Sequence, residues 1–260
     1  MSVLAVHAPA HDAVRYTVRI AADADEVAAA QRLRHRVFAG ELGARLRSPA
    51  TQLDVDPFDE HCDHLVVVDE STGAVVGTYR MLPPGRAPRR YSEGEFDLSA
   101  LAPIQGDLVE AGRSCVDAAH RDGAVINLMW AGIARYLHLT GHRWLAGCAS
   151  VGLGDGGATA AGVWDLATRR HLSPPGYRVL PHRPWTPVER PAAASLGSSG
   201  AVSTGRLPVP PLLKGYLRLG AWICGAPAYD PDFACADFFV LLSLDRIDPR
   251  YLRRFLGERP

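Results

Sequence analysis

The sequence predicts an α/β (α+β) protein in which a mixed central sheet is flanked by helices. Short apolar or alternating runs, typical of strands, are separated by longer segments whose apolar residues recur three or four positions apart, as in helices. The chain has 260 residues, 47% of them hydrophobic, which is enough for one large domain with a buried core.

The N-terminal half is predicted to contain a strand, a helix and a hairpin. Residues 16–20 alternate as a strand does, and Asp23 or Asp25 can cap the helix that follows. The apolar residues of that helix are Val27, Ala30, Leu33 and Val37. Residues 64–69 and 75–82 are two strand-like runs separated by a short Gly-containing turn, so we expect them to pair.

The next segment alternates strands with helices. Residues 108–116 form the fourth predicted strand, and residues 123–139 repeat apolar residues at helical spacing. Gly141 is placed to end that helix. A short strand at 144–149 and a helix over about 156–171 complete this part.

One domain is expected to span residues 16–260, preceded by a loose tail at 1–15. Residues 173–211 hold many of the prolines and a Gly/Ser stretch, so we predict a long irregular insertion there. Apolar sequence resumes at 212–224, and residues 238–244 form a terminal strand.

Charge and composition exclude several classes of protein. Lys+Arg and Asp+Glu both number 28, so the net charge is +0 and no global field favours nucleic acid. No apolar run reaches the roughly 18–20 residues of a membrane span, and the N-terminus does not resemble a secretory signal. We therefore expect a cytoplasmic protein, at most held loosely at the inner membrane face.

Cysteine and histidine patterns predict no metal site and no disulfide framework. The five cysteines are odd in number, lie far apart and form no CxxC pair. His61 and His64 flank a Cys-Asp pair, but no second cluster completes a zinc site. Asp230, Asp232 and Asp237 are interpreted as caps and turn residues.

The predicted strand 108–116 carries the first candidate catalytic residues, Glu110 and Arg113. Residues three apart on a regular strand point to opposite faces. Gly112 lies between them, and a glycine inside a strand often marks a bulge that redirects side chains and frees backbone N–H groups. The alternative is an ordinary ion pair at a sheet edge, worth at most about 1 kcal/mol if exposed.

The loop after this strand has the features of an anion site. Arg121 and Gly123 lie between the end of the strand at Val116 and the start of the helix at Ala124. Loop N–H groups and the helix dipole both favour a phosphate there. Many helices begin in this way without a ligand, and that alternative stays open.

Five further residues are candidates for substrate binding. Arg34 and Phe38 are four apart and share a face of the predicted helix. Asp56 and Asp59 present two carboxylates that could attract a cation, although a helix cap plus a turn is the commoner explanation of such a pair taken alone. Arg80, near the end of a strand, could pair with a carboxylate through two hydrogen bonds.

The series from Arg34 to Arg113 resembles the signature of the acyl-homoserine-lactone synthases, an acyl-transferring branch of the GNAT superfamily. Within that branch the chain is similar to the ornithine N-alpha-acyltransferases. The stretches that carry this second likeness are 36–42, 56–59, 62–65, 77–80, 95–98, 110–115 and 213–220. The resemblance covers roughly residues 32–245 and implies a GNAT-like fold whose sheet splays at the fourth strand.

The resemblance implies transfer of a long, 3-hydroxylated acyl chain from acyl carrier protein to the α-amine of ornithine, giving lyso-ornithine lipid. Glu110 would take the amine proton, Arg113 or Arg80 would hold the substrate carboxylate, and Asp56 with Asp59 would pair with the side-chain ammonium. No tightly bound cofactor is implied. The co-substrate would be the phosphopantetheine thioester of the carrier protein, or acyl-CoA.

Two departures bear on the choice of substrate. Ala44 stands where the lactone synthases usually have a tryptophan, and this lowers the expectation of lactone synthesis. Residues 121–123 keep only one Arg and one Gly of the superfamily's pyrophosphate loop, which suits the single phosphate diester of a carrier protein better than coenzyme A. The alternatives are another amine acceptor and a non-catalytic protein that binds acyl thioesters.

Overall fold

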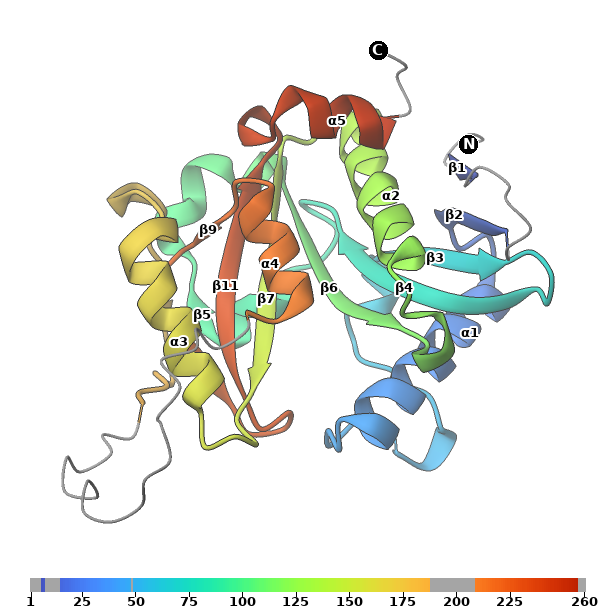
Figure 1. Cartoon of the computed structure of the whole chain (residues 1–260), viewed down its shortest axis with the longest axis horizontal. Helices are drawn as coiled ribbons and strands as arrows, with labels where there is room; N and C mark the ends of the chain where they lie inside the picture. The colour runs from blue at the N-terminus through green and yellow to red at the C-terminus, as the bar shows by residue number, and fades with distance from the viewer. Residues whose placement is uncertain (1–5, 8–14, 48, 188–208, 257–260) are drawn as a thin grey trace, which may run out of the picture.

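The computed structural model describes residues 6–7, 15–47, 49–187 and 209–256 (Figure 1). Its strands are β1 (Val6–His7), β2 (Tyr16–Ile20), β3 (Asp63–Asp69), β4 (Ala74–Leu82), β5 (Phe96–Asp97), β6 (Leu108–Val116), β7 (Trp144–Gly152), β8 (Leu180–Pro181), β9 (Trp222–Ile223), β10 (Ala228–Asp230) and β11 (Cys235–Ser243). Its α-helices are α1 (Ala24–His35), α2 (Ala124–Thr140), α3 (Ala158–Leu166), α4 (Pro211–Arg218) and α5 (Pro249–Leu256).

The main sheet has the order β1-β2-β3-β4-β6-β7-β11-β10. The short strand β9 lies outside this order and pairs with β11. Neighbouring strands are antiparallel except β6 and β7, which are parallel. The predicted mixed sheet with flanking helices is therefore confirmed. The strand ranges 16–20 and 108–116 match the prediction residue for residue.

Local signals in the sequence account for the boundaries of the helices and of the hairpin. The Asp23 carboxylate accepts a hydrogen bond from the Glu26 N–H, 3.0 Å away, and so caps α1. Gly141 ends α2 with φ +74°, a conformation that costs glycine little. Gly73, with φ +70°, turns the chain between β3 and β4.

Alternate residues of β3 bury opposite faces of the sheet. Leu65 and Val67 belong to the core cluster that also contains the buried residues of α2. Val66 and Val68 pack with Ala30 of α1 on the other face. Since successive side chains of a strand point to opposite faces, the two helices sandwich this half of the sheet.

The sheet opens into a wedge at its centre. β6 and β7 pair only where Leu108–Glu110 lies beside Trp144–Ala146, and no pairing follows beyond that point although both strands continue. A Cβ added to Gly147 would lie 2.1 Å from the carbonyl oxygen of Ala111. The absence of a side chain at Gly147 therefore allows the two strands to touch just before they part, which confirms the expected splay.

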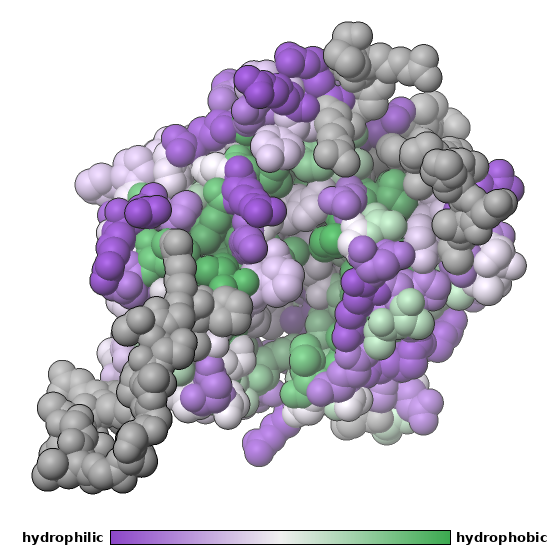
Figure 2. All heavy atoms as spheres, in the orientation of Figure 1, coloured by the Kyte–Doolittle hydropathy of each residue, from purple (hydrophilic) through white to green (hydrophobic). Residues whose placement is uncertain are grey.

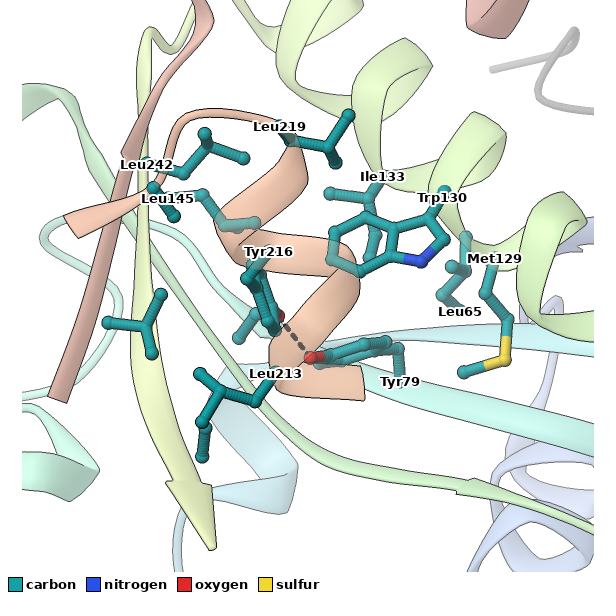
Figure 3. Close-up of a cluster of buried hydrophobic side chains, with 14 of the residues drawn as sticks. Leu65, Tyr79, Met129, Trp130, Ile133, Leu145, Leu213, Tyr216, Leu219 and Leu242 are labelled. Carbon is teal, nitrogen blue, oxygen red and sulfur yellow. Dashed lines mark hydrogen bonds between the residues drawn. The ribbon is translucent and has the colours of Figure 1, made fainter. Parts of the chain in front are cut away.

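Helix α4 fills one side of this wedge (Figure 3). The Tyr216 hydroxyl of α4 is hydrogen-bonded to the Tyr79 hydroxyl of β4. Its ring also meets Trp130 of α2 edge to face, with centroids 4.6 Å apart. Leu213 and Leu219 belong to the same core, so α4 joins the two halves of the sheet.

Part of the predicted irregular insertion belongs to the folded core. Within 173–211, β8 pairs with β5 in a small second sheet, and α4 begins at Pro211. Residues 188–208, with the Gly/Ser stretch, lie outside the described residues. Most of the predicted tail does too, although β1 within it pairs with β2. The predicted helix over 156–171 is α3 followed by a π-helical turn at 167–171.

Among the described residues, no helix combines the length and the apolar character that crossing a bilayer requires.

Candidate active site

β6 is bulged beside β4. Arg80 pairs with Gly112, but Thr78 pairs with Cys115, so β6 has one residue more than β4 between these pairs. Arg113 lies in this interval with φ +53°, a left-handed conformation rarely adopted by a side-chain-bearing residue. The expected bulge is present. The prediction that it is centred on Gly112 was wrong, because Gly112 is still paired with Arg80 and the distortion falls on Arg113.

A cavity of about 230 Å³ lies where β6 and β7 separate. In the space-filling view a hollow is visible below α4, with apolar residues on its rim (Figure 2). The predicted site residues that line the cavity are Phe38, Arg80, Glu110 and Arg113. Glu110 and Arg113 therefore face one cleft, as the bulge led us to expect.

Glu110 is buried and holds a neighbouring turn. One carboxylate oxygen accepts the Tyr91 N–H at 2.7 Å. The other accepts the Ser92 N–H at 2.8 Å and a hydrogen bond from the Ser92 hydroxyl. Because both oxygens carry bonds from the 3-10 turn Tyr91–Gly94, Glu110 fixes the position of that turn on the cavity wall.

Arginines and aspartates alternate in a buried network beside this cavity. We call it the arginine–aspartate network; its members are Arg34, Arg80, Arg113, Asp54, Asp56 and Asp59. Arg34 is fully buried, with nitrogens 2.9 Å from Asp54 and 2.7 Å from Asp59. Burial raises the pKa of Asp59, but the charges of Arg34 and Arg80 outweigh it, and the pKa falls to about 2.

The other two arginines complete the network. Arg80 lies 2.6 Å from Asp56 and 2.9 Å from Asp59. Arg113 contacts Asp56 at 3.0 Å and Asp54 at 3.1 Å, and its guanidinium stacks on Tyr91 at 4.9 Å. These contacts hold the bulged residue in its unusual backbone conformation.

The ion pairs within this network bear on the substrate-binding roles expected of Asp56 and Asp59. Asp56 and Asp59 each contact two arginines, so their charges are already balanced within the chain. Sequence reasoning missed Asp54, which is 2% exposed. Its signal was the acid spacing at 54, 56 and 59, which places three carboxylates in one short loop.

A second group of acids lies beside the two arginines Arg80 and Arg113 in the lining of these cavities, and Asp237 is its buried member. We call it the unpaired carboxyl cluster; its members are Glu95, Asp230 and Asp237. One carboxylate oxygen of Glu95, one of Asp237 and the Sγ of Cys148 all lie within 4.8 Å of one another. Asp230 caps a turn, since it accepts the N–H groups of Asp232 and Phe233, as predicted. The prediction for Asp237 was wrong, because it is a buried residue within β11.

A larger cavity of about 550 Å³ adjoins the first. Phe58, Tyr91 and Asp230 line both. The larger cavity also has three exposed arginines on its wall, for which no ion pair is found within the described part of the chain. These are Arg47, Arg89 and Arg183.

The expected anion loop lies at the far end of β6. Its members are Val116, Arg121, Gly123 and Ala124, and none of them lines either cavity. Arg121 donates to the Val116 carbonyl at 3.0 and 2.9 Å and pairs with Glu41 at 2.7 Å. The Ala124 N–H donates to the Asp122 carboxylate at 2.9 Å. Arg121 and the Ala124 N–H, two of the donors expected to meet a phosphate, are thus engaged by the chain itself.

The comparisons with known proteins agree with this geometry. Residues 33–131 match a family model described as an acetyltransferase (GNAT) domain. An L-ornithine N(alpha)-acyltransferase of Brucella abortus (strain 2308) is 34% identical over 93% of this chain and 89% of its own length. A protein of the same name from Rhodobacter capsulatus is also 34% identical, over 94% of this chain and 95% of its own.

Solved structures show the same fold at lower identity. The CoA-dependent acyl-homoserine lactone synthase BjaI superposes with a TM-score of 0.54 at 18% identity, covering 90% of this chain and 82% of its own. The AHL synthase LasI has a TM-score of 0.50 at 11% identity, covering 94% and 96%.

The family model and the fold together identify the chain as an acyltransferase of the GNAT class. The two relatives allow the family to be assigned within this class, since their sequence similarity extends over almost the whole chain. The chain belongs to the L-ornithine N(alpha)-acyltransferase family.

Proposed function

We propose that this acyltransferase moves a long 3-hydroxyacyl group from the thioester of acyl carrier protein to the α-amine of L-ornithine, giving lyso-ornithine lipid. The names of the relatives support ornithine as the acceptor. The observation that carries the proposal is the wedge between β6 and β7, whose cavity lies beside the bulge at Arg113.

The wedge supports a thioester donor. An extended pantetheine arm can lie along a strand edge that has no partner, and the part of β6 beyond Glu110 offers such an edge toward β7. The thioester would then lie beside Glu110 and Arg113, where backbone N–H groups of the bulge can polarise its carbonyl. The acyl chain would extend into the apolar part of the cleft.

The anion loop favours a carrier protein over coenzyme A as the source of that arm. A pyrophosphate needs several free donors at a helix N-terminus. Here Asp122 already takes the first N–H of α2, and Arg121 is held by Glu41 and by the Val116 carbonyl. A carrier-bound arm has one phosphate diester and therefore needs fewer hydrogen-bond donors from this loop.

The larger cavity would receive the amino acid. Its exposed arginines can pair with the substrate carboxylate, because no acid within the described part of the chain neutralises them. Carboxylates on the shared wall would face the cationic groups of ornithine. The arginine–aspartate network would position the bulge rather than bind substrate itself.

The direct test is an assay of the purified protein with 3-hydroxyacyl carrier protein and ornithine. We expect equal amounts of free carrier thiol and acyl-ornithine, measured with a thiol reagent and by mass spectrometry. Acyl-CoA replaces the carrier protein in a second arm, and S-adenosylmethionine, lysine or glycine replaces ornithine in others. Release of thiol with another acceptor only, or with acyl-CoA only, would contradict the proposed substrates.

A further inference from the structure

The unpaired carboxyl cluster has no counter-charge. Asp237 is 3% exposed and forms part of the small cavity wall. Glu95 Oε2 is buried and has no hydrogen-bond donor. Within the described part of the chain, no basic nitrogen lies within ion-pair distance of Glu95, Asp230 or Asp237. Buried carboxylates are costly unless a cation or a proton compensates them, so the cluster is built for one or the other.

A shared proton would compensate the charge of the cluster. Burial raises the pKa of Glu95, and the nearby charges of Asp237 and Asp230 raise it further. Burial also raises the pKa of Asp237. One side-chain oxygen of each residue lies within 4.8 Å of the other, so the two carboxyl groups titrate together, and a proton held between them would relieve their repulsion.

The pair lies where the two cavities meet. Asp237 faces the cavity that contains Glu110 and Arg113, whereas Glu95 faces the larger cavity with the free arginines. An amino acid with its carboxylate in the larger cavity would bring its α-nitrogen toward this shared wall.

We propose that Asp237 and Glu95 bind the α-ammonium group of the amino-acid acceptor and remove its proton before attack on the thioester. This inference rests on the proposed function, because it assigns groups to the acceptor of that reaction.

The reaction then involves two proton transfers. The α-ammonium gives one proton to the ionised member of the pair, which becomes fully protonated. The neutral amine attacks the carbonyl carbon, and the carbon–sulfur bond breaks as the amide forms. A second proton passes from the nitrogen to the departing thiolate, giving free carrier thiol. The pair then returns its extra proton to water.

Glu110 has a different role in this arrangement. Its oxygens accept three hydrogen bonds from Tyr91 and Ser92, at the start of the turn that leads to Glu95. Glu110 therefore positions the turn that carries one member of the pair.

Several other groups face the pair and contribute to its titration. They are Asp230 of β10, Cys235 of β11, Cys148 and Ser150 of β7, and Tyr91 of the turn, while Glu110 of β6 lines the same cavity as Asp237 and acts on Cys148. Burial and the neighbouring carboxylates raise the pKa of Cys148 well above its ordinary value. The Cys148 thiol is therefore protonated at neutral pH and does not compete as base or nucleophile.

The experiment compares Asp237→Asn and Glu95→Gln with wild type. We expect kcat/KM for ornithine to fall by about 10²–10⁴-fold in Asp237→Asn, as for loss of a general base. The acid limb of the pH–kcat/KM profile should shift or disappear, because it reports protonation of the pair. Asp245→Asn is the control: this exposed acid follows the same strand and pairs with Arg143 at the surface. Its activity should match wild type.

A second acceptor distinguishes a role of the pair at the α-amine from a role at the δ-ammonium of ornithine. Norvaline lacks the δ-ammonium, so a pair that serves the α-amine should be needed equally for both acceptors. Full norvaline activity in Asp237→Asn, or an unchanged acid limb, would overturn the proposal. So would a stoichiometric metal ion whose removal abolishes activity and whose return restores it. Failure of the wild-type protein to acylate ornithine would instead defeat the proposed function itself.

Discussion

Two groups of acids lie beside the candidate site, and they differ in what neutralises them. In the arginine–aspartate network, three carboxylates meet three guanidinium groups, and every acid contacts two arginines. In the unpaired carboxyl cluster, no arginine, lysine or histidine of the described chain is within ion-pair distance.

The difference shows how charge pairing separates structure from chemistry. An acid balanced by arginine is ionised in the folded enzyme and has no capacity for another cation, so it stabilises the bulge on which it lies. Glu95 and Asp237, which lack an arginine partner, have a raised pKa and can exchange a proton with a substrate. The same residue type therefore serves two roles, and the neighbours decide which.

The largest expected effect comes from removing an acid of the network. Asp59→Asn leaves Arg34 and Arg80 with one ionic partner fewer in a buried site, so we expect a loss of about 3–5 kcal/mol in the free energy of unfolding. Urea denaturation measures the change. Asp245→Asn breaks an exposed pair and should cost about 0–1 kcal/mol. A loss below 1 kcal/mol in Asp59→Asn would show that the network is not structural.

A smaller effect is expected where the two halves of the sheet touch. Gly147→Ala would place a Cβ 2.1 Å from the Ala111 carbonyl oxygen, and backbone must move to relieve the clash. We expect a cost of about 1–3 kcal/mol and reduced acyl transfer, because the wedge is displaced. Gly152→Ala on the same strand is the matched control, since no atom lies within 4 Å of its added Cβ. Equal stability of the two variants would contradict the account of the wedge.

The pH dependence of stability should distinguish the two groups. Asp59 has its pKa lowered from 3.8 to about 2, so its contribution is present above pH 3.8 and is lost as the pH falls toward 2. Glu95 has its pKa raised from 4.5, so the folded state holds an extra proton and stability falls as the pH rises above 4.5. Glu95→Gln should flatten the decline at higher pH. An unchanged slope in the melting temperature between pH 5 and 8 would refute this.

Much of the fold follows from local pattern. The strand at 108–116 and the helix ending at Gly141 were predictable because alternation, helical period and a capping glycine are local properties. The pairing of β5 with β8 was not, because Phe96 and Pro181 are brought together only by the tertiary fold. The π-helical turn Arg36–Glu41 likewise interrupts a helical pattern without a local signal.

The candidate site was only half predictable. Glu110 and Arg113 were found because an acid, a glycine and an arginine in one strand suggest a bulge at a cleft. Asp237 was missed, because an acid just before a long apolar run looks like a strand boundary, whereas β11 begins two residues earlier at Cys235. Pairing between Asp56 or Asp59 and the arginines depends on the folded arrangement, which spacing alone does not give.

The most direct test of the contrast between the two groups is the free energy of unfolding at pH 8, measured side by side for Asp59→Asn and Asp237→Asn. We expect opposite outcomes: Asp59→Asn is strongly destabilised, whereas Asp237→Asn is as stable as wild type or more stable, because an unpaired buried charge has been removed. Equal destabilisation of both variants, with turnover per folded molecule retained in Asp237→Asn, would contradict it.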